Sequence, residues 1–452
     1  MTTAEVPLPS ILDSVSYVRR LSKPTAAEVL RAARDAGRVA VQPRCGVGGH
    51  AEMLALLRDL EAGAAPDILT ITIDSHTRLK RFDSALRSLT ANPADLNGYP
   101  LVTHGWQRGR ELNEAVQAPI EVRHGSPDAR ILFEYAVASG ITSFEGGGIS
   151  YNLPYSKDVP LATSLRCWQE VDALTGELAR LGLVVDRELF GTLTAVLVPP
   201  SISLAISVLE AVAAALEGVR CISISYPQGG NLAQDVAALR AIPLLAQRYL
   251  PDGVEVFAVL HEFMGVFPRE RRHAEQLILY GALVARLGGA AKIITKTYHE
   301  AFGIPDTQAN VDGLRLAALV NTQLLDFLTV PEEQVAAELE FILEEVAQIV
   351  EPVLAQSDLV TAISDAFASG RLDIPFSASK HAHSEIIPRR DDTGAIRYLA
   401  AGDLPLADGV LRRHHRQLEC DQGPDMRAMM AGLADDINYF LALFGEEQAA
   451  TL

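Results

Sequence analysis

The sequence predicts an α/β fold, a (β/α)8 TIM-type barrel with an N-terminal extension and a smaller C-terminal domain. From about residue 38 onward, short runs rich in Val and Ile alternate with longer segments of helical period, the pattern of a parallel sheet with helical crossovers. The runs are almost continuously apolar, as expected of strands buried on both faces. A barrel needs about 250 residues. The span 38–312 fits it better than an open doubly wound sheet, which would usually divide into two domains at this length.

Nine apolar runs are candidate strands, one more than a barrel of eight requires: Val39–Gln42, Ile68–Ile73, Leu101–Thr103, Ile120–Val122, Ile141–Phe144, Leu193–Val198, Cys221–Ser225, Val254–Leu260 and Lys292–Thr295. One run must lie outside the closed sheet or not be a strand, and Leu101–Thr103 is the weakest because it is short and follows a proline. The pattern predicts helices at Ala51–Leu60, Pro127–Ala138, Leu165–Leu181, Ile202–Leu216, Asn231–Arg248 and Glu270–Leu287.

The segments outside the barrel differ in character. Residues 1–37 form the N-terminal extension, whose helix at Ala26–Ala36 we expect to cover one end of the barrel. Residues 313–452 form the C-terminal domain. Amphipathic helices are expected at Val311–Leu328 and Pro331–Leu354, and Asp373–Asp408 is polar and loop-rich.

Composition excludes several classes of protein. With 39 basic and 57 acidic residues the net charge is −18, which argues against nucleic acid and anionic membranes as partners. Met1–Pro9 lacks the features of a signal peptide, and the apolar stretch Leu193–Val219 is interrupted by two prolines and Glu210, so no membrane span is expected. The cysteines are scattered without metal-site spacing, which predicts a cytoplasmic protein without disulfides: Cys45, Cys167, Cys221 and Cys420.

Polar residues follow most of the candidate strands, where barrel enzymes carry their chemistry. They are Arg44, Asp74, Arg78, Arg123, His124, Glu145, Tyr226, His261, Glu262 and Lys296. Guanidinium groups bind carboxylates through two parallel hydrogen bonds, so three arginines at one barrel mouth suit a small substrate with two carboxylates. The alternative is that each arginine pairs with a neighbouring acid and ties loops together.

The segment Glu145–Tyr155 is the most informative. Three consecutive glycines after a strand permit positive φ and close approach of a ligand, although they also fit a simple tight turn. Glu145 is placed to accept a proton or bind an ammonium group, and Tyr151 and Tyr155 add hydroxyls. Lys296 and Glu300 lie four residues apart at the start of an expected helix, a spacing that an ordinary surface ion pair also explains.

Three other patterns compete with this interpretation. Residues 46–51 match G-x-G-x-x-A after a strand, which predicts a dinucleotide site, but Asp74 lies farther away than the usual ~20 residues. Asp74 and His76 begin like the D-x-H-x-x-G motif that supplies a histidine to cobalamin, yet Leu79 replaces the glycine. No third ligand is spaced with the pairs His381/His383 and His414/His415, so no metal site is assigned.

With these residues in view, the sequence resembles the large epsilon subunit of the glutamate mutase (methylaspartate mutase) family, from about Val41 to Leu399. The resemblance rests on residues 41–44, 72–78, 96–98, 123–125, 145–155, 197–201, 264–268, 296–305 and 373–376. It implies a (β/α)8 barrel and an adenosylcobalamin-dependent radical isomerase that interconverts L-glutamate and (2S,3S)-3-methylaspartate. It also implies a small cobalamin-binding sigma subunit as partner, which ligates the cobalt, and a homodimer of this chain within a heterotetramer.

The resemblance implies site residues as well. Arg44, Arg78 and Arg123 would grip the two substrate carboxylates, with His124 beside them, while Glu145 faces the amino group and Tyr151 and Tyr155 complete the shell. The coenzyme would be contacted by Gly46, Asn97, Pro154, Phe267, Lys296, Glu300 and Ile304. Glu145, Lys296 and Glu300 would be the catalytic residues: Glu145 as proton acceptor or electrostatic anchor, Lys296 and Glu300 by steering the adenosine ribose.

The sequence departs from the family pattern at His76, at Phe144 and at Tyr226–Gly229. On a strand, neighbouring side chains alternate, so we expect Phe144 to point away from the cavity while Glu145 points into it. Three alternatives remain: an NAD-dependent oxidoreductase that uses Gly46, Gly48 and Ala51, a mutase acting on another dicarboxylic amino acid, and a catalytically silent regulatory barrel.

Overall fold

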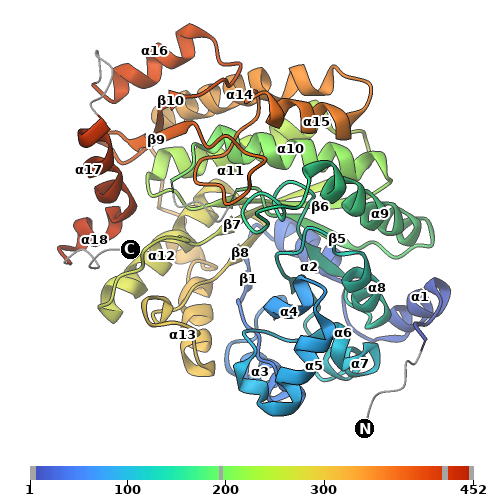
Figure 1. The fold of residues 1–452 in the computed structure, drawn as a ribbon. Helices are drawn as coiled ribbons and strands as arrows, with labels where there is room; N and C mark the ends of the chain where they lie inside the picture. Colours follow the sequence, from blue (N-terminus) through green and yellow to red (C-terminus); the bar gives the residue numbers. More distant parts are fainter. Residues whose placement is uncertain (1–6, 193–196, 420–425, 447–452) are drawn as a thin grey trace.

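Eight parallel strands form one sheet in the computed structural model, which describes residues 7–192, 197–419 and 426–446. The order of the strands is β1-β8-β7-β6-β5-β4-β3-β2, and the amide of Thr72, the last residue of β2, donates to the carbonyl of Cys45 after β1 at 2.9 Å. The sheet therefore curls into a nearly closed barrel, as predicted (Figure 1). The strands are β1 Ala40–Gln42, β2 Leu69–Thr72, β3 Ile120–Arg123, β4 Ser143–Glu145, β5 Asp186–Leu189, β6 Cys221–Pro227, β7 Glu255–His261 and β8 Lys292–Ile294.

Helices surround the barrel between successive strands. The main ones are α3 His50–Ala64, α8 Arg130–Ala138, α9 Leu161–Arg180, α10 Pro200–Leu216, α11 Leu232–Tyr249, α12 Arg271–Gly288 and α13 Thr307–Ala318. Between β2 and β3 lie α4 Ser75–Arg78, α5 Phe82–Ala91, the 3-10 helix η1 Pro93–Asp95, α6 Leu101–His104 and α7 Trp106–Glu114. The expected helix Val311–Leu328 is wrong beyond Ala318. There Asn321 exchanges two hydrogen bonds with the Val39 backbone, at 2.9 and 2.8 Å, and diverts the chain, which continues through the short 3-10 helix η3 Gln323–Leu325.

Two of the nine candidate strands are corrected. Leu101–Thr103 lies in the helical turn α6, where Leu101 and His104 are buried at helical spacing. Of Leu193–Val198, residues 193–196 lie outside the described residues, and Leu197 and Val198 are not in a strand. The fifth strand is Asp186–Leu189 instead, which the search for apolar runs missed because it carries three charged residues.

The interior of the barrel is polar, so the expectation of almost continuously apolar strands is wrong for the inward face. Lys292 Nζ donates to Glu121 Oε2 at 2.8 Å and to Glu188 Oε2 at 2.6 Å, and all three side chains are fully buried. Ser143 Oγ lies 2.9 Å from both Glu121 Oε2 and Asp186 Oδ2, within hydrogen-bond distance of each carboxyl group. Buried charges are tolerated only when they are paired and hydrogen-bonded, and this network meets that requirement.

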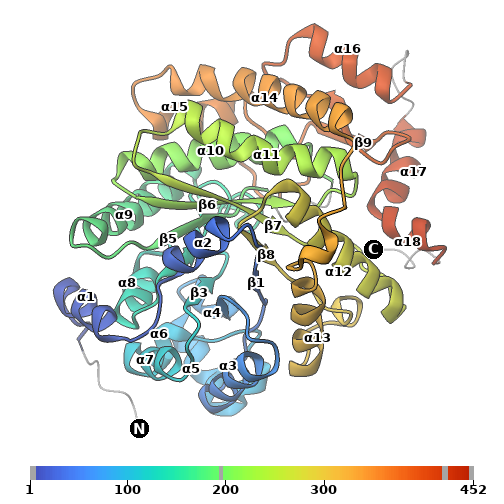
Figure 2. The same ribbon diagram turned by 180° about the vertical axis from the view of Figure 1, so that it is seen from behind.

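The N-terminal extension contributes two helices, α1 Ile11–Arg20 and α2 Ala26–Asp35. Thr25 and Glu28 form a capping box at the start of α2, and the amide of Ala26 donates to Thr142 Oγ1 at 3.0 Å. Ala26, Ala27 and Leu30 pack in one cluster with residues at or before the N-terminal ends of strands, among them Ile68 and Cys221. Helix α2 therefore covers the N-terminal end of the barrel, as predicted (Figure 2).

The C-terminal region packs on one side of the barrel. Its elements are α14 Glu332–Leu354, α15 Leu359–Ala368, β9 Ile386–Arg390, β10 Ile396–Ala401, α16 Asp408–Gln417, α17 Met426–Ile437 and α18 Tyr439–Phe444. Helix α14 lies against α10 and α11. The segment Asp373–Asp408, expected to be polar and loop-rich, contains the antiparallel hairpin β9–β10. Before the hairpin, Ser377 Oγ donates to the Leu153 carbonyl at 2.8 Å, so this loop reaches the mouth of the barrel.

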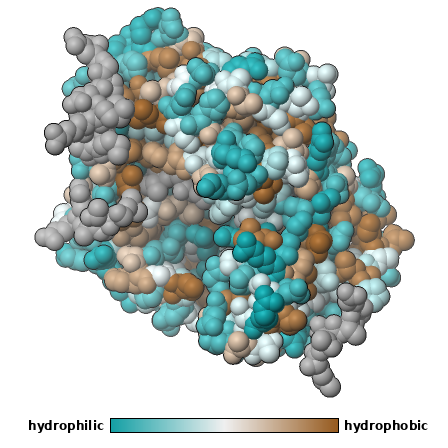
Figure 3. Space-filling model, in the orientation of Figure 1, coloured by the Kyte–Doolittle hydropathy of each residue, from teal (hydrophilic) through white to brown (hydrophobic). Residues whose placement is uncertain are grey.

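The described residues contain no single helix that is long and apolar enough to cross a membrane. The helices α14 and α15 pass that test only as a pair, and they are bent by 117° relative to each other. Polar and apolar residues are interspersed on the face that Figure 3 shows.

Candidate active site

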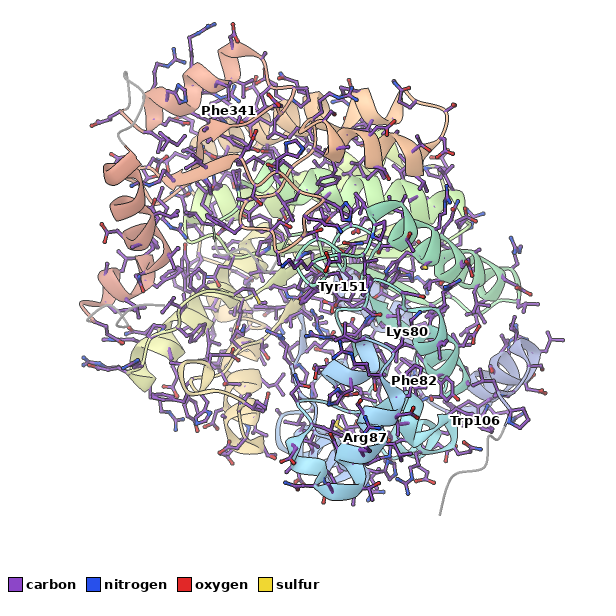
Figure 4. The ribbon with its side chains drawn as sticks, viewed as in Figure 1. Lys80, Phe82, Arg87, Trp106, Tyr151 and Phe341 are labelled. Carbon is purple, nitrogen blue, oxygen red and sulfur yellow. The ribbon has the colours of Figure 1, made fainter. Side chains whose placement is uncertain are left out.

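The turn after β4 carries Glu145 and Tyr151 to the mouth of the barrel. Gly146 has φ 116°, a conformation that L side chains rarely adopt, and its amide donates to the Glu188 carbonyl at 2.7 Å. The chain then turns so that the Tyr151 hydroxyl donates to Oε2 of Glu145. Tyr151 is fully buried and lies near the centre of the view in Figure 4. The glycines therefore serve a turn that joins a carboxyl to a phenol.

Arg123 at the end of β3 is surrounded by three carboxyl groups. Its guanidinium donates to Glu121 Oε1 at 2.8 Å, to Glu188 Oε1 at 3.2 Å and to Glu145 Oε1. Glu145, Glu188 and His261 have the mutual spacing of metal ligands, but the guanidinium bonds to both carboxylates and lies within 3.4 Å of the imidazole. Arg123 thus pairs with neighbouring acids, which was the alternative left open for each strand-end arginine.

The pKa of the Glu145 carboxyl group is raised well above its usual value. Burial raises the pKa of Glu145 to about 8, opposed by Arg123 and reinforced by the charges of Glu188 and Glu121. A carboxyl with such a pKa exchanges a proton near neutral pH, as acid–base chemistry at an active site requires.

Arg44 and Arg78 differ from Arg123 because neither forms an ion pair within the described ranges. Arg78 lies over the ring of Tyr155, with 5.7 Å between its guanidinium carbon and the ring centroid. Arg44 contacts the sulfur of Met264 at 3.8 Å. Burial raises the pKa of Tyr155 to about 12, and Arg44, Arg78 and Arg123 all act on this hydroxyl in the opposite direction. The structure therefore brings the three arginines together around Tyr155, with two of them available to an anionic ligand.

Helix α4 holds Arg78 in place. Asp74 caps its first turn, since Oδ2 accepts from the amides of His76 and Thr77 at 2.8 and 3.1 Å. Asn97 Oδ1 accepts from the amide of Ser75 at 2.9 Å. Asp74 is accordingly a helix cap, and Asn97 supports the turn that presents Arg78.

A pocket of about 290 Å³ adjoins Arg44 at the barrel mouth. Its lining includes Arg44 and four residues carried over as coenzyme contacts: Gly46, Asn97, Glu300 and Ile304. Beside it, Lys296 Nζ lies 2.6 Å from Glu300 Oε2, and the Lys296 amide donates to Glu262. The helix expected to carry this pair is absent: Glu300 opens a single 3-10 turn, η2 Glu300–Phe302, and α13 begins only at Thr307.

Other carried-over residues lie outside this pocket. The ring of His124 stacks on Trp168 with 5.7 Å between centroids, lies 4.8 Å from the ring of Phe144 and meets the ring of Tyr151 edge-on at 4.7 Å, so it packs beside the phenol of the site. Burial lowers the pKa of His124 well below its usual value, so the ring is neutral. Phe267 is 4% exposed within an apolar cluster, and Pro154 is half-buried in the turn before Tyr155.

Two departures from the family pattern have structural explanations. Phe144 packs against Phe133 of α8 and Trp168 of α9, while Ser143 and Glu145 beside it bond inside the barrel. The expectation that Phe144 points away from the cavity is thereby confirmed. Tyr226 donates to Asp235 Oδ1 at 2.9 Å, a carboxylate that also accepts from the amides after Tyr226, so this stretch anchors α11.

Arg187 on β5 is a site residue that the strand-end search missed. It is fully buried and donates to the carbonyls of Phe144 and Gly146 at 2.6 and 2.8 Å, and to Asp172 at 2.9 Å. It therefore clamps the backbone on both sides of Glu145. The available signal was the alternation Asp186-Arg187-Glu188-Leu189, which has the period of a strand with a polar inner face.

The glycines of residues 46–51 and the histidine pairs, which competed with this interpretation, have structural explanations. A side chain at Gly46 would clash with the Thr72 carbonyl, and one at Gly48 with Pro93 and Leu96, so both glycines are explained by close loop packing. The sheet is a barrel, not the open sheet that a dinucleotide fold requires. His414 Nε2 bonds to Glu345 at 2.9 Å inside the C-terminal region.

Fold and site together define a class: a barrel enzyme whose site joins arginines without ion-pair partners among the described residues to a buried carboxyl–phenol pair at the C-terminal ends of the strands. The family model of the methylaspartate mutase E chain (MutE) matches residues 22–440, and the chain belongs to that family. The resemblance inferred from the sequence is confirmed.

Three relatives show how extensive the similarity is. The glutamate mutase epsilon subunit of Desulfitobacterium hafniense is 41% identical, with 85% of this chain and 81% of that protein aligned. Those of Escherichia coli O157:H7 and Halobacterium salinarum are each 40% identical, with 89% of this chain and 86% of each relative aligned. The chain is thus one subunit of a multi-subunit isomerase of the glutamate mutase type.

Proposed function

We propose that this chain is the catalytic subunit of a mutase that interconverts L-glutamate and (2S,3S)-3-methylaspartate. The observation that carries the proposal is the presence of two arginines without an ion-pair partner among the described residues, Arg44 and Arg78, near the half-buried Tyr155 and the Glu145–Arg123 pair. Arginines remain protonated and bind carboxylates without acid–base side reactions. A substrate with two carboxylates and one ammonium group matches these charges.

In this proposal, different residues bind different groups of the substrate. Arg44 and Arg78 bind its carboxylates, and Arg123 shares its donors between Glu145 and the ligand. Glu145 faces the amino group, and with a pKa of about 8 it accepts or returns a proton there. Held at both ends, the migrating fragment stays oriented for rearrangement.

The pocket beside Arg44 suits a ribose. The Lys296–Glu300 pair offers donors and acceptors for hydroxyl groups, and Gly46, Asn97 and Ile304 line the remaining wall. These residues would hold the adenosyl end of adenosylcobalamin. Pro154 and Phe267, which the family resemblance also implies as coenzyme contacts, would join them. Adenosylcobalamin supplies the radical chemistry when bound, and the protein excludes water from it.

The cobalt ligand comes from another protein in this proposal. The motif that begins at Asp74 is incomplete, since Leu79 replaces its glycine, and Asp74 already caps α4. We therefore infer a small cobalamin-binding sigma subunit as partner, in a heterotetramer built on a homodimer of this chain.

A substrate panel tests the proposal. The chain is mixed with a sigma subunit and adenosylcobalamin, and products are followed by NMR for glutamate, 3-methylaspartate, a longer dicarboxylic amino acid and leucine. Interconversion of the first two, with leucine inert, supports the assignment. Because Phe144 points away from the cavity, this departure does not reshape the pocket, and glutamate should remain preferred over the longer dicarboxylate. Turnover of leucine alone contradicts the role given to the arginines, since it would leave buried guanidinium groups unpaired.

A further inference from the structure

A second cavity of about 580 Å³ lies outside the barrel wall, between α9 and α10 and beneath the connection from α14 to α15. Its inner end is formed by Gly147, Gly148 and Glu210, directly behind the turn that carries Tyr151. Half of its lining residues are apolar: Leu165, Trp168, Leu189, Val212, Ala213, Leu216, Leu354, Leu359, Val360 and Ile363. The rest include four acidic side chains, so a ligand here would have both an apolar part and a polar or charged part.

Glu210 is the polar group at the inner end of the cavity, and only one of its two carboxylate oxygens accepts hydrogen bonds from the described residues. Its side chain belongs to a residue that is 4% exposed, and Oε1 accepts from the amides of Ile149 and Ser150, both at 2.8 Å. Oε2 has no hydrogen-bond partner among the described residues. Burial raises the pKa of Glu210 to about 7, because a buried carboxylate with an open acceptor is costly, so a bound cation would stabilise its ionised form.

The other acidic groups of the lining are already engaged. Asp172 accepts from Arg187, Glu217 accepts from Gln169 at 2.8 Å, and Asp358 caps α15 by accepting from the amide of Thr361 at 2.9 Å. Arg166 is the one cationic side chain among the lining residues that the structure describes. The acidic lining and the open acceptor both favour a cation over an anion.

We propose that this cavity binds a small primary amine as its ammonium ion, with the charged head on Oε2 of Glu210 and an apolar tail against the leucines of α9 and α10. An ammonium group carries three donors and no acceptor, which complements a carboxylate oxygen that lacks a donor. The apolar tail displaces water from the remaining wall.

Binding there acts on the turn that bears the active-site residues. Glu210 holds the amides of Ile149 and Ser150, immediately before Tyr151, and a side chain at Gly147 would clash with its carboxyl group. A ligand on Oε2 fixes this carboxylate and with it the position of Tyr151. The effect on turnover rests on the proposed function, whereas the binding itself does not.

Trp168 provides the measurement, because it lines the cavity and the only other tryptophan, Trp106, lies at the periphery on α7 (Figure 4). In the full chain carrying Trp106→Phe, the fluorescence of Trp168 is titrated with n-hexylammonium, and with n-hexanol and hexanoate as neutral and anionic probes of the same length. We expect a saturable change with the ammonium ion, at an affinity about tenfold or more above that of hexanol, and weaker still with hexanoate. Equal affinities for amine and alcohol, or no saturation, overturn the proposal.

Two variants locate the site. Glu210→Gln keeps an oxygen for both amides but removes the charge, and it should weaken hexylammonium binding by about tenfold or more without changing hexanol binding. Glu217→Gln, which removes a charge from the same lining, should leave the affinity within about a factor of two. Ala213→Phe fills the cavity and should abolish binding of both probes. Unchanged hexylammonium affinity in folded Glu210→Gln or Ala213→Phe places the amine elsewhere and contradicts the proposal.

Discussion

The guanidinium group of Arg123 donates a hydrogen bond to Oε1 of Glu145 between the ends of the neighbouring strands β3 and β4. One residue expected to bind a substrate carboxylate is therefore paired with the residue expected to face the substrate amino group. In the proposed function, the substrate carboxylate takes donors from Arg123 and its ammonium group binds Glu145, so substrate binding separates this pair.

Arg123→Lys tests the double role of Arg123. A lysine cannot reproduce the fork of donors that bonds three carboxylates, so we expect kcat/KM to fall about 10- to 150-fold and the free energy of unfolding to fall by roughly 1–3 kcal/mol. Steady-state kinetics and urea denaturation measure the two effects. Normal kinetics would remove Arg123 from the site.

Arg78→Lys is the matched case, because Arg78 has no ion-pair partner in the described structure. We expect a similar loss of kcat/KM, but a change in the free energy of unfolding within about 0.5 kcal/mol. A large loss of stability with unaltered kinetics would show that Arg78 ties loops together instead.

Glu145→Gln addresses the pH dependence of stability. The pKa of Glu145 is raised from 4.5 to about 8, so between these values the folded protein holds a proton that the unfolded chain has released. Its contribution to stability is complete below pH 4.5 and is lost as the pH rises through 8. The variant should lose less stability than the parent across this window, by up to about 1.4 kcal/mol per pH unit in urea denaturation. Parallel curves for the two proteins would mean that Glu145 is ionised throughout.

Arg187→Lys tests the clamp on the backbone around Glu145. The lysine cannot hold the carbonyls of Phe144 and Gly146 and the carboxylate of Asp172 at once, so we expect kcat to fall about tenfold or more with KM less affected. Arg397→Lys is the control, since Arg397 is also buried and bonds Glu338 and Asp391, far from the barrel mouth. Both variants should lose stability, but only the first should lose kcat. Equal kinetics in the two would reduce Arg187 to a structural residue.

The sequence predicted those helices and strands whose apolar residues recur with a regular helical or strand spacing. Helix α14 is found within one residue of its expected start because its apolar face repeats with the helical period. Strand β5 was missed because Asp186 and Glu188 point into a polar barrel, where Lys292 and the serines satisfy them. These ion pairs and hydrogen bonds join strands that are distant in the sequence. The only local sign of them in the sequence is the alternation of residues along β5.

The site shows the same division. Arg44, Arg78 and Glu145 could be selected because barrel enzymes carry their chemistry after the strands. That Arg123 bonds three carboxylates, and that His124 belongs to an aromatic layer with Trp168, depends on which side of the wall each residue faces in the folded barrel. The exact first and last residues of each short strand determine which side chains face inward. The sequence alone does not predict these boundaries to a single residue.

The most direct test of the proposed function is the absorbance of cobalamin in the reconstituted enzyme. The chain is combined with a small cobalamin-binding sigma subunit and adenosylcobalamin, and the visible spectrum is recorded before and after glutamate is added, with the chain alone as the control. We predict a spectral change on addition of glutamate that is absent with leucine and requires both proteins. A spectrum that glutamate leaves unchanged in the assembled complex, or tight binding of cobalamin by this chain alone with a histidine on cobalt, would contradict the account.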